Sequence, residues 1–235
     1  MKLKGDYLER LFRARGIKVR VGNIEPHRMK IYYEPSKELL SLNSEVMALA
    51  ERFDCLEYAI ADGNVDAINF HTNCQNVDDI SSKFNSELIA SIGIIFDPSY
   101  KPYTLGYRLN GGMSIYFYPT VWKETRYGIR GLTDRKLIEN QLIRFLSFIS
   151  ASNDCKNWIL NQIPYIEKFK GVCITNYKNK NSFKLYYRIT SQGIRTIFSS
   201  YCDVEEYCNK YGNVVLTSVS IVNGEVDSFN LYFLR

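Results

Sequence analysis

A five-residue pattern occurs four times in this chain: RMKIY at 28–32, GMSIY at 112–116, SFKLY at 182–186 and SFNLY at 228–232. Each copy ends in an aliphatic residue followed by tyrosine, and a polar residue precedes the aliphatic one. Successive side chains of a β-strand point to opposite faces. Each copy therefore predicts a strand with one apolar and one polar face, and four such strands constrain the fold more than any other feature.

Helix-like and strand-like patterns alternate along the chain, and no low-complexity linker separates them. We predict helices at about 5–15, 36–53, 78–90, 133–150 and 153–163, and two short helices within 192–211. Five antiparallel hairpins are predicted, with strands at 17–21 and 28–34, 56–61 and 65–71, 91–96 and 113–118, 172–177 and 183–189, and 214–222 and 228–234. Residues 103–109 are either an extra strand or an ordered excursion.

Consecutive antiparallel hairpins exclude a Rossmann sheet, which needs parallel crossovers. A sheet of ten strands tends to close on itself, because closure removes the exposed edges. We therefore expect an α+β fold with a single domain over residues 1–235. Its centre is expected to be a ten-stranded antiparallel β-barrel of five hairpins, surrounded by a ring of α-helices.

Helices outside a barrel need the apolar face of each strand, so the polar residues are expected to face the lumen. These residues are Lys18, Arg20, Arg28, Lys30, Tyr32, Ser114, Tyr116, Tyr118, Lys184, Tyr186, Ser228, Asn230 and Tyr232. Several cations around one cavity repel one another unless an anion neutralises them. Lys, Arg and phenolic hydroxyls suit a diphosphate, and tyrosine rings stabilise a carbocation. A solvated sheet face is the alternative interpretation of the same alternation.

The composition limits the kinds of ligand, metal and macromolecule that the protein is expected to bind. The net charge of +5 suits an anionic ligand, but the basic residues are too few and too evenly spread for nucleic acid. The chain has no apolar run long enough to span a membrane, and its first residues lack the apolar core of a secretory signal, which predicts a cytoplasmic protein. Six cysteines at irregular spacings predict reduced thiols, and two histidines outside any zinc spacing predict no structural metal.

Four segments resemble the ABBA-type aromatic prenyltransferases, whose αββα repeats build a ten-stranded barrel. Three of them, RMKIYYEP (28–35), FKLYYRIT (183–190) and FNLYFLR (229–235), are most similar to the cyanobactin peptide prenyltransferases. The fourth, GGMSIYFYPTVWKETRYGIRG (111–131), is similar to a strand of the fungal indole prenyltransferases that ends in Tyr-Phe-x-Pro. The resemblance implies transfer of a dimethylallyl or geranyl group from an allylic diphosphate to a nucleophilic side chain of a cyclic or linear ribosomal peptide. Ionisation in that family needs no metal, so no cofactor is expected and Mg²⁺ is optional.

By position, the resemblance implies that Arg28, Tyr116, Lys184, Tyr186 and Tyr232 contact the diphosphate or shield the cation. With the rest of the polar face, the expected diphosphate-binding residues are Lys18, Arg20, Arg28, Lys30 and Lys184. The expected cation-shielding and substrate-binding residues are Tyr32, Tyr116, Tyr118, Tyr186, Asn230 and Tyr232.

The chain departs from the indole enzymes of this family at three points. Ser114 stands where they have lysine, and Lys18 and Arg20 occupy the strand that carries their acidic base. The chain is also short for the family, which predicts trimmed loops and a wide barrel mouth. The candidates for a catalytic base are Glu25, Glu57, Asp97 and His71, or the acceptor needs none, and His71 is alternatively a structural residue.

Other interpretations stay open at this stage. The acceptor is alternatively a small indole or phenol, and the barrel alternatively binds an anionic ligand without chemistry. The pair Asp78–Asp79 fits the first turn of a helix, where acids favour the helix dipole, better than a metal motif. Lys168, Lys170, Lys178 and Lys180 are expected to form a solvated rim. The sequence does not fix the acceptor atom, the prenyl length or the oligomeric state.

Overall fold

The computed structural model describes residues 15–20, 23–24, 28–33, 55–61, 64–73, 86–96, 100–108, 113–119, 131–177 and 180–234. The strands are β1 (Arg15–Arg20), β2 (Asn23–Ile24), β3 (Arg28–Tyr33), β4 (Cys55–Ala61), β5 (Asn64–Asn73), β6 (Tyr100–Arg108), β7 (Met113–Pro119), β8 (Ile166–Tyr177), β9 (Lys180–Ile189), β10 (Asn213–Val222) and β11 (Glu225–Leu234). The helices predicted at 5–15 and 36–53 fall outside these residues, except for Arg15, which begins β1.

The strands form one antiparallel sheet in the order β11-β10-β9-β8-β7-β6-β5-β4-β3-β1-β2. Hairpins β4–β5, β8–β9 and β10–β11 confirm three of the predicted strand pairs. The predicted first hairpin is less regular, because β1 pairs with β3 only at Arg15–Met29 and Gly16–Arg28. Strand β1 pairs over its whole length with β11, from Arg15–Phe233 to Arg20–Ser228.

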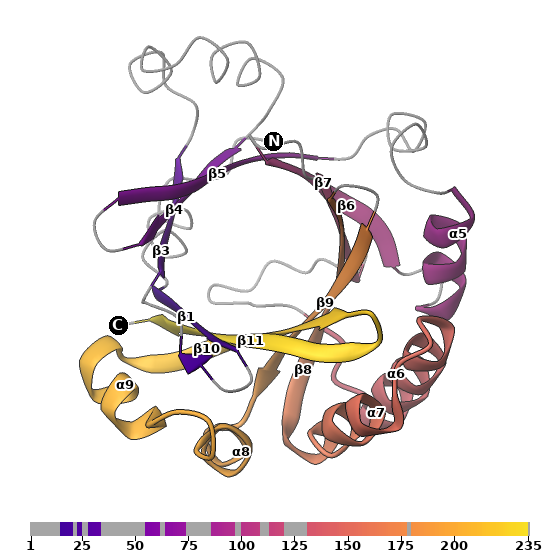
Figure 1. Ribbon diagram of the computed structural model, residues 1–235. Coiled ribbons are helices and arrows are strands. Elements are labelled where there is room, and N and C mark those ends of the chain that lie inside the picture. The colour runs from indigo at the N-terminus through magenta and orange to yellow at the C-terminus, as the bar shows by residue number, and fades with distance from the viewer. Residues whose placement is uncertain are drawn as a thin grey trace, which may run out of the picture.

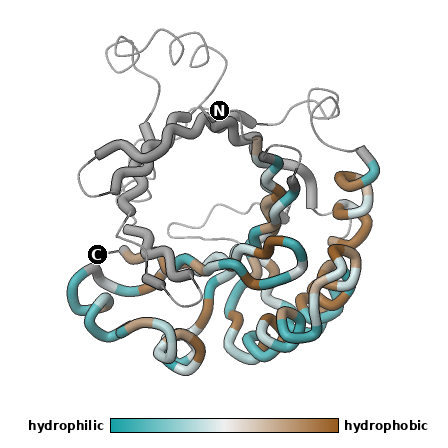
Figure 2. The backbone as a smooth tube through the Cα atoms, in the orientation of Figure 1, coloured by the Kyte–Doolittle hydropathy of each residue, from teal (hydrophilic) through white to brown (hydrophobic). Residues whose placement is uncertain are grey.

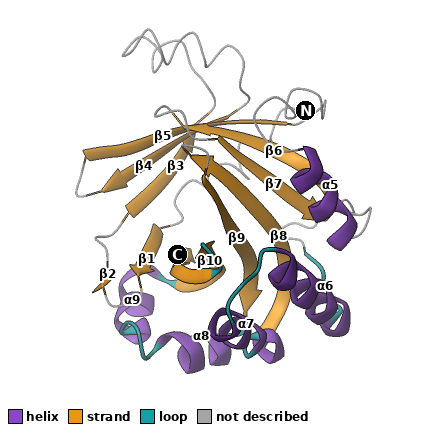
Figure 3. Ribbon diagram, turned by 45° about the vertical axis from the view of Figure 1, so that its right-hand side comes forward, coloured by secondary structure: helices purple, strands orange, loops and turns teal. Residues whose placement is uncertain are grey.

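Five α-helices are described, and they lie on the convex side of the curved sheet (Figures 1 and 3). They are α5 (Ser86–Ile95), α6 (Arg135–Phe148), α7 (Asn153–Leu160), α8 (Ser191–Phe198) and α9 (Val204–Tyr211), and a 3-10 turn, η1 (Ile163–Tyr165), follows α7. Residues of opposite hydropathy alternate along them (Figure 2). The helices predicted near 133–150, 153–163 and 192–211 are therefore confirmed, although Asp134 rather than Thr133 caps α6, by accepting a hydrogen bond from the Leu137 amide.

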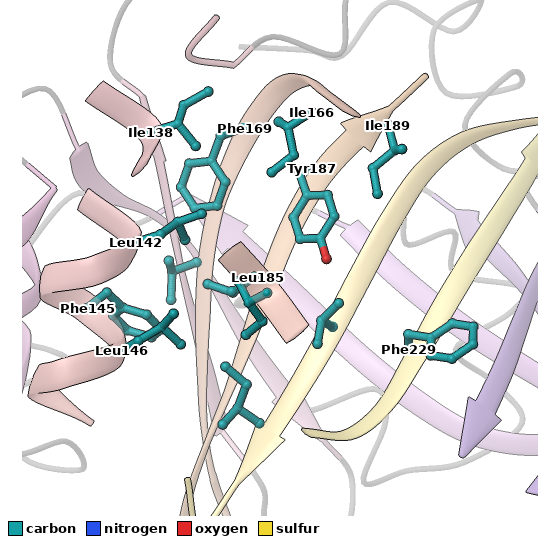
Figure 4. Close-up of a cluster of buried hydrophobic side chains, with 14 of the residues drawn as sticks. Ile138, Leu142, Phe145, Leu146, Ile166, Phe169, Leu185, Tyr187, Ile189 and Phe229 are labelled. Carbon is teal, nitrogen blue, oxygen red and sulfur yellow. The ribbon is translucent and has the colours of Figure 1, made fainter. Parts of the chain in front are cut away.

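The hydrophobic core lies between these helices and the sheet (Figure 4). Helix α6 contributes Phe145, which packs edge-on against Phe183 of β9 with ring centroids 5.6 Å apart. Phe229 of β11 lies 4.5 Å from the Phe198 ring of α8, and Trp158 of α7 stacks beside it. Burial of such aromatic and aliphatic side chains is the main stabilising term of a sheet covered by helices.

The expected ten-stranded barrel of five hairpins inside a ring of helices is wrong. The part of the sheet that carries the described helices is a run of six antiparallel strands, β6–β11, with α5–α9 against one face. The whole strand order contains eleven strands rather than ten. The described helices cover one side of that run. The strands therefore carry apolar side chains on that side and polar side chains on the other.

The region around residue 91 also differs from the prediction. Residues 91–96 were expected to form a strand, but 91–95 belong to α5, which buries Ile89, Ile92 and Ile95 at helical spacing. The hairpin partner of β7 is β6, so of the two alternatives left open for residues 103–109 the extra strand is the one observed. An apolar run without alternation fits either a buried strand or a buried helix, and here the three-residue spacing of the isoleucines decided the outcome.

No helix among the described residues is both long and apolar enough to cross a membrane.

Candidate functional site

Strands β7–β11 have one face against the helices and one face turned away from them. Ile115, Phe117, Leu185, Phe229 and Leu231 are fully buried in the helix-facing core. The residues between them lie on the opposite side, which we call the concave face. Its described members are Ser114, Tyr116, Cys173, Thr175, Ser182, Lys184, Tyr186, Ser218, Ser220, Ser228, Asn230 and Tyr232.

One row of these residues crosses five strands at the same level. Tyr116 lies opposite Cys173, and Cys173 lies opposite Lys184. Lys184 in turn lies opposite Ser220, and Ser220 lies opposite Ser228. Directly opposed residues of antiparallel strands have Cβ atoms about 5 Å apart, so the row places an ammonium among a phenol, a thiol and two hydroxyls.

A second row runs beside the first. Tyr186 of β9 lies opposite Ser218 of β10, and Ser218 lies opposite Asn230 of β11. The rings of Tyr116 and Tyr186 are 6.2 Å apart between centroids, with planes inclined at 45°. The sheet therefore brings together the final tyrosines of two of the repeated segments, GMSIY and SFKLY, which are 70 residues apart in the sequence.

Hydrogen bonds fix the polar side chains of the concave face. The Asn230 Nδ2 group donates to Ser218 Oγ at 3.0 Å, and Ser218 Oγ lies 3.4 Å from the Tyr232 hydroxyl. The hydroxyls of Ser114 and Thr175 are 2.9 Å apart, so a threonine of β8 pairs with the serine that stands in place of the expected lysine. These residues are buried or half-buried, and such contacts restrict their rotamers.

The N-terminal strands continue these rows in the backbone register. Arg20 is the Cα partner of Ser228, and Lys18 is the partner of Asn230. Arg28 pairs with Gly16 and with Ala61. The predicted residues of β1 thus occupy register positions next to the concave-face residues of β11.

The other predicted residues are placed only by backbone or not at all. Lys30 is the Cα partner of Ala59, Tyr32 of Glu57, His71 of Cys55 and Tyr118 of Lys101. Glu25, Asp97 and the Asp78–Asp79 pair lie outside the described residues. The identity of a catalytic base therefore stays a prediction.

Lys170 was expected in a solvated rim, and that expectation is wrong. It is the extra residue of a β-bulge in β8, between the pairs Phe169–Tyr187 and Gly171–Tyr186. Phe169 and Tyr187 are completely buried on the helix-facing side, whereas Lys170 keeps a partly exposed side chain, which therefore emerges on the concave side. Loss of hydration by burial lowers the pKa of its ammonium from 10.5 to about 8.

Sequence reasoning did not assign Cys173, Thr175, Ser182, Ser218 and Ser220 to this face, nor Lys170 to its edge. Cys173 stands between Val172 and Ile174 in an apolar run that hides the alternation. The bulge at Lys170 shifts the alternation by one residue, and a bulge has no dependable sequence signal. Ser218 had a usable signal, since TSVSIV alternates polar and apolar residues in the same way as the four repeats.

The thiols outside the concave face are poor nucleophiles. Burial is the main cause that raises the pKa of Cys155 and of Cys202 to about 11, so both stay protonated at neutral pH. In the part of the chain that is described, no three His, Cys, Asp or Glu side chains gather as a metal site would require. The described side chains of the concave face offer an ammonium, hydroxyls, aromatic rings and the Cys173 thiol.

No protein-family model matches this chain, and comparison with curated proteins finds no match either.

Proposed function

We propose that the concave face binds an allylic diphosphate and that the protein transfers its dimethylallyl or geranyl group to a nucleophilic side chain of a ribosomal peptide. The observation that supports this proposal is the position of Lys184. Its row holds the Tyr116 phenol on one side and two serine hydroxyls on the other, opposite the predominantly apolar face that packs against the helices. An ammonium forms strong hydrogen bonds to phosphate oxygens, and tyrosine rings beside it attract a carbocation.

The proposed step is a displacement at an allylic carbon. The bond between that carbon and the bridging oxygen breaks, and the diphosphate keeps the electron pair. Lys184, with Lys170 and the serine hydroxyls, stabilises the charge that develops on the leaving group. The rings of Tyr116 and Tyr186 shield the allylic cation. The acceptor forms the new bond with its own electron pair, and its proton passes to a base or to solvent.

The nature of the acceptor rests on the resemblance of the short segments to peptide prenyltransferases. A small indole or phenol is the competing acceptor, and binding of an anion without chemistry is the competing function. Ionisation is proposed to need no divalent metal, because the chain offers ammonium groups for the leaving diphosphate. A cytoplasmic location and a single domain also stay predictions.

Incubation of the protein with dimethylallyl diphosphate and an acceptor panel tests the proposal. The panel contains free tryptophan, free tyrosine and simple phenols, and linear and cyclic peptides with the same side chains, and the products are identified by mass. We expect a gain of one prenyl unit on peptides, in EDTA as well as in Mg²⁺, and at least a tenfold loss in the Lys184→Ala variant.

Three results would contradict parts of this proposal. Faster turnover of the free small molecules would replace the peptide by a small aromatic acceptor. Tight binding of diphosphate without any prenylated product on the whole panel would contradict the transferase and favour a binding protein. Loss of activity in EDTA that Mg²⁺ restores would contradict metal-independent ionisation.

A further inference from the structure

Three polar residues on β10 and β11 form a continuous chain of hydrogen-bonding groups on the concave face. Asn230 Nδ2 donates to Ser218 Oγ at 3.0 Å, and Ser218 Oγ is 3.4 Å from the Tyr232 hydroxyl. The exposed fractions are 0% for Ser218, 9% for Asn230 and 8% for Tyr232, so bulk water contributes little to satisfying these groups. A buried chain of this kind is polarised along its length.

Either hydroxyl of the Ser218–Tyr232 pair can donate, and the hydrogen bond that Ser218 accepts from Asn230 favours Ser218 as the donor to Tyr232. The Asn230 amide donates, so one acceptor position of the Ser218 hydroxyl is already occupied. Among the described residues, the hydroxyl that Ser218 faces on its other side is that of Tyr232. When Ser218 donates its proton to the Tyr232 oxygen, the phenol must direct its own proton elsewhere. On the neighbouring strand β1 the Cα partner of Tyr232 is Gly16, which has no side chain that could accept this proton.

We propose that Ser218 is a positioning residue that, held by Asn230, aims the hydroxyl proton of Tyr232 at the phosphate oxygens of a diphosphate on the concave face. This inference rests on the proposed function and deepens it, because it assigns Tyr232 a role as hydrogen-bond donor to the leaving group in addition to that of its ring. A cation lies nearby, because Lys184 precedes Tyr186 by two residues on β9, and Tyr186 is the Cα partner of Ser218.

A donor that is polarised by two preceding hydrogen bonds is stronger than an isolated phenol. The hydrogen bond from such a donor strengthens most when negative charge accumulates on its acceptor. A departing diphosphate undergoes that change. Inorganic pyrophosphate is that leaving group in its final charged form. It therefore reports on the proposed contact without requiring turnover.

The test is a double-mutant cycle on pyrophosphate affinity, measured by calorimetry at fixed pH and salt concentration. The proteins are the wild type, Ser218→Ala, Tyr232→Phe and the double variant. Loss of a hydrogen bond to a charged group predicts about a tenfold weaker affinity for Tyr232→Phe. We expect Ser218→Ala to weaken binding roughly threefold or more in the wild-type background and to have no effect once Tyr232 is phenylalanine.

Two further variants separate positioning from a general effect on β10. Ser218→Thr keeps the hydroxyl and is expected to restore at least half of the affinity lost in Ser218→Ala. Thr217→Val changes the adjacent residue, which lies on the helix-facing side and whose buried hydroxyl has no partner. This variant is expected to leave the affinity for pyrophosphate unchanged. Should Ser218→Ala fold poorly, Asn230→Ala removes the first donor of the chain and is expected to show the same dependence on Tyr232.

The outcomes distinguish the two proposals. A wild-type protein that does not bind pyrophosphate overturns both the proposed function and the positioning role. Binding by the wild type together with an equal loss for Ser218→Ala in the two backgrounds, or with no loss at all, overturns the positioning role alone. A loss confined to proteins that contain the Tyr232 hydroxyl supports it.

Discussion

At the scale of single residues, the environment of a side chain decides its chemistry more than its type does. Lys170 and Lys184 are both lysines of the β8–β9 hairpin, but Lys170 sits in a bulge where burial lowers its pKa to about 8. Below that pH the protein must keep a poorly hydrated ammonium, which costs stability. An anion bound on the concave face would reduce that cost, because it would attract the ammonium.

The stability of the protein should therefore depend on pH through Lys170. An unfolded lysine titrates near 10.5, and Lys170 in the folded chain titrates near 8, so between these values the unfolded state binds more protons. The free energy of unfolding then rises with pH across this interval. Between pH 7 and pH 9.5 we expect the wild type to gain roughly 1–2 kcal/mol relative to Lys170→Met, measured by urea unfolding.

The Lys170→Met variant serves as the reference because every other titrating group is common to both proteins. If the two unfolding free energies change in parallel over this pH range, the lysine is hydrated in the folded state and its assignment to the bulge environment is wrong.

At the scale of elements, local signals place the helix ends and the turns. Asn223 and Gly224 have φ values of 52° and 78°, as a tight hairpin turn between β10 and β11 requires. This turn also holds the start of α7, since the Gly224 carbonyl accepts from the Ser152 amide at 3.0 Å. The Ser152 hydroxyl accepts from the Cys155 amide and donates to the Glu225 carboxylate at 2.8 Å.

Ser152 thus joins a helix N-cap to a strand turn that lies seventy residues away in sequence. Replacing it by alanine should lower the free energy of unfolding by about 1–2 kcal/mol, because a capping hydrogen bond and the contact to Glu225 are lost together. Ser199→Ala at the exposed end of α8 is the matched control, expected to change stability by less than about 0.5 kcal/mol. Equal effects of the two substitutions, in the same unfolding assay, would show that the Ser152 contacts do not fix α7.

The elements were predictable where the sequence carries a period or a cap. The alternation in SFKLYY and SFNLYF gave β9 and β11 with the correct apolar face, and Ser152 and Thr190 mark true helix starts. Residues 91–95 were misassigned because so short an apolar segment fits a buried strand as well as a buried helix, and the helical spacing shows only when Ile89 is included. A bulge such as that at Lys170 shifts the side-chain alternation through backbone geometry, so the sequence pattern did not predict it.

At the scale of the whole molecule, the sequence predicted which side chains share a face but not how the sheet is built. Alternation within a strand is local, whereas the number of strands and the way a sheet curves depend on pairing between distant segments. The expected ten-stranded barrel failed for that reason, while the polar grouping of Tyr116, Lys184 and Asn230 arises from the register of neighbouring strands. A catalytic base is identified by its contacts with residues that are distant in the sequence. The pattern of a single strand contains no information about those contacts.

The central claim is that the polar concave face, and not the helical side, recognises a diphosphate. Its most direct test is the affinity for a dimethylallyl diphosphate analogue whose bridging oxygen is replaced by sulfur, which slows cleavage, measured by calorimetry for three proteins. Lys184→Ala should weaken binding about tenfold or more. Lys136→Ala removes the same charge from an exposed position of helix α6 and should change the affinity by less than about twofold. Equal affinity in all three proteins, or an equal loss in both variants, would contradict the claim.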